Sequence, residues 1–152
     1  MTVGIVCETA AHTMAVGRRL AGLLRAGDVL LIEGELGVGK TTFVAGLAEG
    51  LGVEEPITSP TFILMRTYEG LMPLTHADVY RVETLAEIED LDLTEAAREG
   101  VLAVEWGNAI EQWMPASHLE VRLELTGGEQ RTVHLIPRGP GWEKRPLEEV
   151  AV

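Results

Sequence analysis

The stretch Gly34-Glu35-Leu36-Gly37-Val38-Gly39-Lys40-Thr41 (GELGVGKT) decides the fold expected for this chain, because it fits the P-loop pattern G-x-x-x-x-G-K-[ST] in full. Its glycines let successive backbone N–H groups curl around a phosphate without Cβ clashes, and a following helix points its positive end at the same place. The Lys40 ammonium can reach the β- and γ-phosphates of a nucleotide, and the Thr41 hydroxyl can bind Mg²⁺. The stretch therefore predicts a site for a nucleoside triphosphate and Mg²⁺.

The segments on either side of this stretch support the same prediction. Before it, Val29-Leu30-Leu31-Ile32 is a continuous apolar run, typical of a central parallel strand buried on both faces. After it, apolar residues recur at helical spacing: Phe43, Val44, Leu47 and Leu51. A buried strand, a glycine-rich turn and a helix in this order indicate an α/β, P-loop NTPase-like fold with a central, mostly parallel sheet flanked by helices.

Further elements are expected around this unit. Thr9 is a plausible N-cap for a first helix, Thr84-Leu85-Ala86-Glu87 matches a capping box, and Asp92-Leu93-Thr94-Glu95 is a third helix start. Strands or extended segments are expected at residues 2–7, 58–66, 71–81, 101–104, 119–125 and 131–136, the last two joined as a hairpin through Gly127-Gly128. We therefore expect one domain over residues 1–136 and a loosely attached tail over 137–152, which is rich in Pro, Gly and charge.

Composition restricts the partners of this domain. The chain has 152 residues, one cysteine (Cys7), and a formal net charge of −12. We find no cluster of Lys and Arg of the kind that binds nucleic acid directly, so any role in RNA chemistry would have to run through a partner. Without a signal peptide or a membrane-spanning apolar run, the sequence predicts a cytoplasmic protein. The guanine-binding motif N-K-x-D is also absent, which favours ATP over GTP.

Candidate partners for the metal and the attacking water stand on other strands. Glu105 follows the buried run 101–104, and it is either a metal-side acid or a surface residue at a strand end. His76 and Asp78 are two apart, so in a strand both project from one face. Asp78 could hold Mg²⁺ or position the water, whereas a structural role is the commoner one for a lone histidine such as His76. Thr61 could close on the γ-phosphate like a GTPase switch threonine, although from the residues alone a turn with Pro60 at its bend is the favoured explanation.

Taken together, these motifs resemble one family. Four segments follow one another at fitting distances: Gly34–Thr42 (GELGVGKTT), Ser59–Leu64 (SPTFIL), His76–Arg81 (HADVYR) and Glu105-Trp106 (EW). Their order and spacing, rather than any single motif beyond the P-loop, resemble the TsaE (YjeE) family, the ATPase component of bacterial tRNA threonylcarbamoyladenosine (t6A) biosynthesis. The resemblance covers roughly residues 3 to 136.

The resemblance implies specific roles for these residues. It implies that Thr41 is a metal ligand, that Glu105 lies beside the metal, that Thr61 belongs to a switch-like loop, and that Asp78 is needed for hydrolysis. It places Trp106 next to the nucleotide. ATP and Mg²⁺ would be held by a run of P-loop residues, with two more residues toward the adenine: Leu36, Gly37, Val38, Gly39, Lys40, Thr41 and Thr42, then Thr9 and Arg131.

The resemblance also implies partners. Members of the family act with the TsaD and TsaB proteins, which transfer threonylcarbamoyl to the adenosine at position 37 of tRNAs that read ANN codons, and tRNA would be met only through that complex. Two segments depart from the family pattern. Ala77 stands where the family usually has Phe, and Leu85–Leu93 follows the pattern only loosely.

Two alternatives remain open at this point. A small-molecule P-loop kinase shares the motif and the size, but such a kinase usually carries an Arg-rich lid. The region after Tyr80 is acidic instead, with Glu83, Glu87, Glu89, Asp90 and Asp92. A nucleotide-dependent scaffold that binds ATP and barely hydrolyses it is the second alternative, and a turnover assay with partners separates it from an ATPase.

Overall fold

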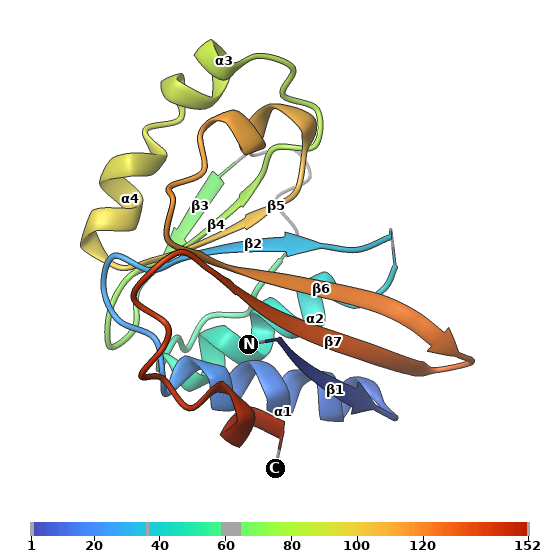
Figure 1. Ribbon diagram of the computed structural model, residues 1–152. Helices are drawn as coiled ribbons and strands as arrows, with labels where there is room; N and C mark the ends of the chain where they lie inside the picture. Colours follow the sequence, from blue (N-terminus) through green and yellow to red (C-terminus); the bar gives the residue numbers. More distant parts are fainter. Residues whose placement is uncertain (1, 36, 59–64, 152) are drawn as a thin grey trace.

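The apolar run that precedes the P-loop forms β2 (Val29–Glu33), the strand at the centre of the sheet. The computed structural model describes residues 2–35, 37–58 and 65–151, and its seven strands lie in the order β1-β7-β6-β2-β5-β4-β3 (Figure 1). β2 pairs in parallel with β5 (Val101–Glu105) on one side and with β6 (His118–Gly127) on the other. This arrangement confirms the expected fold class, a mostly parallel centre carrying helices.

The outer strands complete the sheet. β4 (Leu74–Asp78) lies parallel to β5, while β3 (Met65–Tyr68), β7 (Gln130–Arg138) and β1 (Val3–Cys7) each pair antiparallel with a neighbour. The hairpin expected in the C-terminal part is therefore present as β6–β7. The strand expected over residues 71–81 is shorter than that, because the chain turns directly after Asp78. Of the segment expected over 58–66, residues 59–64 lie outside the described residues.

Helices cover both faces of the sheet. On one face lie α1 (Ala10–Ala21) and α2 (Lys40–Gly50), and on the other lie α3 (Leu85–Asp90), α4 (Leu93–Glu99) and the 3₁₀ helix η1 (Asn108–Gln112) (Figure 1). Alternate residues of β2 divide between the two interiors. Leu30 and Ile32 pack toward α1 and α2, whereas Val29 and Leu31 pack toward α3 and α4. No helix in the described ranges is long and apolar enough to cross a bilayer.

Glycines let α1 and α2 approach each other closely. A Cβ atom at Gly46 of α2 would collide with the backbone carbonyl of Met14, and one at Gly17 of α1 would collide with that of Phe43. The two helices therefore pack backbone against backbone. This contact fixes the direction of α2, the helix whose first turn follows the P-loop.

Two predicted caps are confirmed. The Thr9 hydroxyl accepts a hydrogen bond from the His12 backbone N–H at 3.1 Å and caps α1. The Thr84 hydroxyl likewise accepts one from the Glu87 backbone N–H at 3.2 Å and caps α3. Each satisfies a donor that the helix itself leaves unpaired.

The C-terminal segment differs from the sequence prediction of a loosely attached tail. Its apolar side chains Trp142, Leu147 and Val150 are each 4% exposed or less, and its 3₁₀ helix η2 (Leu147–Ala151) packs against α1. Arg145 forms an ion pair with Asp28 at 2.6 Å, and its guanidinium lies 4.0 Å from the centre of the Trp142 ring. Apolar burial and a paired charge therefore hold this segment on the core.

Candidate nucleotide-binding site

The carboxyl ends of three parallel strands meet at one edge of the sheet. Glu105, the last residue of β5, pairs in register with Ile32 of β2 on one side and with Asp78 of β4 on the other. The P-loop leaves β2 at this edge and leads into α2 (Figure 1). An edge where parallel strands end beside a helix N-terminus is where ligands bind in open α/β sheets.

The P-loop backbone has the conformation that a phosphate site requires. Gly37 and Gly39 have φ of 81° and 108°, in the left-handed region that favours glycine. Gly39 is the N-cap of α2, no side chain caps this helix, and Phe43 makes the first backbone bond back to Gly39, at 2.9 Å. The amides of the first turn therefore remain available to an anion.

Lys40 and Glu105 face each other at the start of α2. The Lys40 ammonium donates a hydrogen bond to the Gly34 carbonyl at 2.8 Å and lies 3.6 Å from Glu105 Oε1. The other carboxylate oxygen, Oε2, lies 3.0 Å from Nε2 of the fully buried His76. Burial acts to raise the pKa of Glu105, but the hydrogen bond and charge of His76 and the charge of Lys40 outweigh it, so this pKa lies below its ordinary value.

Asp78 lies beside Glu105 but has a different partner. His76, Asp78 and Glu105 share one face of the sheet, because β4 and β5 pair in register and the first two are two residues apart. The Asp78 carboxylate accepts a hydrogen bond from the Tyr80 backbone N–H at 3.1 Å, which closes the turn after β4. Ala77 is buried on the opposite face, so its side chain does not pack beside the Asp78 carboxylate.

Of the two residues predicted for the adenine side, Arg131 contacts the P-loop and Thr9 lies at the start of α1. Arg131 of β7 donates a hydrogen bond from Nε to the Val38 carbonyl at 3.0 Å, and it pairs in register with Cys7 at the end of β1. Thr9 follows two residues after Cys7 and caps α1. The strand pair β1–β7 therefore brings both residues to the same side of the loop.

Three other predicted residues are placed differently or lie outside the description. Trp106 follows Glu105 directly, but its ring packs against the cluster under α3 and η1, and its indole N–H donates to Glu111 at 3.0 Å. Leu36 and Thr61 lie outside the described residues. The structure therefore joins Lys40 to Glu105 and Glu105 to His76, and it gives Trp106 a partner away from them.

Two contacts at this edge of the sheet could not be predicted from sequence patterns: that of His76 with Glu105, and that of Glu33 with Arg122. Strand alternation placed His76 on the face of Asp78 but could not show that it meets Glu105, because the pairing of β4 with β5 is long-range. Glu33, at the end of the apolar run, shares Arg122 with Glu120 at 3.4 Å and 3.0 Å. Burial and the neighbouring Glu120 carboxylate raise the pKa of Glu33 to about 7. Hydrogen bonds with Glu33 first, and then with Arg138, lower the pKa of Glu120 to about 2.

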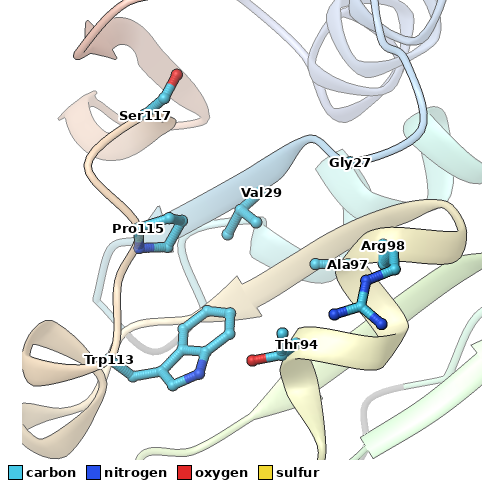
Figure 2. A pocket seen from close by; sticks show the side chains of 8 residues that line it. All are labelled: Gly27, Val29, Thr94, Ala97, Arg98, Trp113, Pro115 and Ser117. Atoms are coloured by element: carbon cyan, nitrogen blue, oxygen red, sulfur yellow. The ribbon is translucent and has the colours of Figure 1, made fainter.

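A hollow of about 330 Å³ lies at the opposite edge of the sheet, between α4 and the chain that enters β6 (Figure 2). Figure 2 shows Trp113 and Arg98 at its rim and Val29 at its floor. It contains no residue of the P-loop and none of the carboxylates above. We therefore assign the candidate site to the P-loop edge, from the motif and the side chains that meet there.

The residues present suit a magnesium nucleotide. Within the described part of the chain, no three His, Cys, Asp or Glu side chains come together as a metal cage. Mg²⁺ in phosphate-transfer sites takes only one or two carboxylates and completes its shell with phosphate oxygens and water. The Thr41 hydroxyl and the carboxylates of Glu105 and Asp78 are oxygen groups of the kind that such a partial shell uses.

Comparisons with known proteins agree with the geometry. The model of the family "Threonylcarbamoyl adenosine biosynthesis protein TsaE" matches residues 7–133. The chain is 44% identical to the tRNA threonylcarbamoyladenosine biosynthesis protein TsaE of Streptomyces coelicolor, over 90% of this chain and 97% of that relative. It is 41% identical to the Bacillus subtilis TsaE, over 87% and 84%. The crystal structure of Bacillus subtilis YdiB superposes with a TM-score of 0.79 and 33% identity, covering 99% of this chain and 95% of that one.

Proposed function

Because this chain belongs to the TsaE family, we propose that it is a Mg²⁺-dependent ATPase that acts in the formation of threonylcarbamoyladenosine in tRNA. The observation that carries this proposal is the meeting of Lys40 with Glu105 at the uncapped start of α2. A cation, a carboxylate and free amides at one helix start suit a bound magnesium triphosphate.

Each residue then has a distinct task. The amides that follow Gly39 bind the phosphates, and Lys40 exchanges part of its contact with Glu105 for the terminal phosphates. The Thr41 hydroxyl holds Mg²⁺, which would neutralise charge developing on the phosphoryl oxygens. Glu105 and Asp78 orient the metal shell and the attacking water from the neighbouring strands.

Three residues complete the proposed site. Arg131, which contacts the Val38 carbonyl, and Thr9, at the start of α1, bind on the adenine side. Thr61 closes on the γ-phosphate. These assignments follow from the family resemblance.

Partners are the second part of the proposal. Among the described residues, no arginine is paired with Glu105 or Asp78, and Arg81 lies exposed in the turn after β4. A P-loop enzyme without a cation at the transferring phosphate forgoes a rate factor on the order of 10³ or more. We propose that the TsaD and TsaB proteins provide this cation or order the active loop, and that a chain of net charge −12 meets tRNA only through them.

The main alternative is a small-molecule kinase. The segment where such an enzyme carries a basic lid is here formed by α3 and α4, with exposed carboxylates such as Glu87 and Glu95. Repulsion between these carboxylates and a phosphorylated substrate disfavours that function.

The test is ATP turnover by the isolated chain, then with the TsaD–TsaB pair, each with and without tRNA at physiological salt. We expect slow turnover alone, a clear rise with the pair, and no retention of tRNA by the isolated chain. Fast turnover that the pair leaves unchanged, or tight tRNA binding by the chain alone, would favour the kinase. Tight ATP binding without turnover under any condition would favour a scaffold.

A further inference from the structure

His76 occupies an unusual place for a histidine. Its side chain is completely buried on the face of the sheet that carries α1 and α2. One ring nitrogen, Nε2, lies 3.0 Å from Glu105 Oε2, and the other, Nδ1, has no hydrogen-bond partner in the part of the chain that the structure describes. A buried polar atom without a partner is costly, so an apolar residue here would suit the fold better.

The contact with Glu105 determines how that carboxylate is turned. Its two oxygens have separate neighbours, since Oε2 faces His76 at 3.0 Å and Oε1 faces the Lys40 ammonium at 3.6 Å. A carboxylate that accepts a hydrogen bond on one oxygen is restrained about its terminal torsion, which is otherwise broad. Oε1 is thereby kept toward Lys40 and the start of α2.

We propose that His76 is a positioning residue, whose Nε2–H holds the Glu105 carboxylate so that Oε1 faces the phosphate end of the P-loop. This inference rests on the proposed function and adds to it a residue that touches neither nucleotide nor metal. Nε2 is the ring nitrogen that donates, because the Glu105 carboxylate can only accept, and Nδ1 has no partner among the described residues. Groups that orient a metal-side ligand in this way commonly affect activity by about 10- to 100-fold.

Two substitutions distinguish a role of His76 in positioning Glu105 from a role in filling space in the core. His76→Leu keeps a similar volume and removes the donor, while His76→Gln places an amide N–H near the position of Nε2 and has no counterpart of Nδ1. We expect His76→Leu to lower partner-stimulated ATP turnover about 10- to 100-fold, with the Kd of a fluorescent ATP analogue within about threefold of the parent. His76→Gln should recover most of the turnover.

Two further measurements exclude a merely structural effect. Thermal unfolding of His76→Leu should match or exceed the parent Tm, because the unpaired Nδ1 is gone. In the parent, His76→Leu should raise the Mg²⁺ concentration that gives half-maximal binding of the ATP analogue. In a Glu105→Gln background, His76→Leu should change neither this concentration nor ATP turnover. If His76→Leu does not fold, His76→Asn replaces it, since this shorter amide ends near Nδ1 and falls short of Glu105.

The outcomes distinguish this inference from the proposed function. Parent protein that binds no ATP would overturn the proposed function itself. An active parent, with His76→Leu at the parent rate or with His76→Asn and His76→Gln equally active, would overturn the positioning role alone. An equal loss in the Glu105→Gln background would also overturn it, because the effect would not pass through Glu105.

Discussion

Two ion pairs lie at opposite edges of the same sheet, one buried and one with a partly exposed lysine, and they differ in how closely their charges meet. At the edge where β2 begins, Arg145 donates to both carboxylate oxygens of Asp28, at 2.6 Å and 3.0 Å. At the P-loop edge, the Lys40 ammonium lies 3.6 Å from Glu105. All four residues belong to the same domain, so the difference reflects the local surroundings rather than the fold.

The partners of each pair explain the difference. Asp28 also accepts a hydrogen bond from the Arg25 backbone N–H at 2.7 Å, and Arg145 donates to the Leu23 carbonyl and lies over the Trp142 ring. The charges of Asp28 and Arg145 are thus matched to each other within the protein, which suits a structural clasp for the C-terminal segment. Lys40, by contrast, stands beyond hydrogen-bond distance from Glu105, so a phosphate can take its charge at little cost.

The clasp should show the largest effect on stability. Asp28→Ala leaves Arg145 buried without its counter-charge, so we expect the free energy of unfolding to fall by about 3 kcal/mol. ATP affinity should change by less than about twofold, since the clasp is at the far edge. Urea unfolding measures the loss, with the exposed Asp90→Ala as the matched control. Equal unfolding curves for the two variants would show that the Asp28–Arg145 pair does not stabilise the fold.

Loss of either carboxylate at the P-loop edge should affect turnover rather than folding. We expect Glu105→Gln and Asp78→Asn to lower partner-stimulated ATP hydrolysis about 100-fold or more, because both act on the metal shell or the water. ATP binding should persist within a few-fold, as calorimetry can measure. Either variant hydrolysing ATP at the parent rate would contradict its assignment, and Asp78 is the sharper test because it also closes the turn at Tyr80.

Lys40→Ala should weaken ATP binding by about 10- to 100-fold, the value of one charge-assisted contact with phosphate. The Tm should stay close to that of the parent, because Lys40 is partly exposed and Glu105 keeps its contact with His76. Lys144→Ala, which removes the other lysine of the chain from the exposed surface, is the matched control. An unchanged Kd for ATP would show that Lys40 does not bind the phosphates.

A smaller effect of pH should come from the acidic pair beside the P-loop. The pKa of Glu33 is raised to about 7, so its folded form binds a proton that the unfolded chain has already released. Its contribution to stability is therefore present at low pH and is lost as the pH rises toward 7. Glu33→Gln should flatten the fall in unfolding free energy between about pH 5 and pH 7.

Urea unfolding at these two pH values checks this prediction, with the exposed Glu129→Gln as control. Glu120 contributes no slope in this window, because its pKa is lowered to about 2 and its stabilisation is lost only in stronger acid. An identical slope in the parent and in Glu33→Gln would mean that Glu33 carries no proton in the folded protein.

Local patterns predicted the parts of this fold that local rules govern. The apolar run before the P-loop predicted a strand buried on both faces, and the end of the run over residues 101–104 placed Glu105 at the edge where the loop begins. The hydroxyls of Thr9 and Thr84 capped helices as expected, because a cap depends on neighbours within four residues.

Contacts between residues far apart in the sequence could not be predicted from local patterns. Trp142, Leu147 and Val150 follow no helical or strand period, so the sequence offered only the Pro, Gly and charge of that segment, and its packing was missed. The contact of His76 with Glu105 depends on β4 lying next to β5, although the two residues are 29 positions apart.

The central claim is that the P-loop edge binds a magnesium triphosphate through its amides and Lys40. The most direct test is a calorimetric titration of the isolated chain with ATP and with adenosine, each with and without Mg²⁺. We predict saturable binding of one ATP per chain, tighter with Mg²⁺, and no measurable binding of adenosine, because the phosphates supply most of the contacts. No saturable binding of ATP, or equal affinity for ATP and adenosine, would contradict the claim.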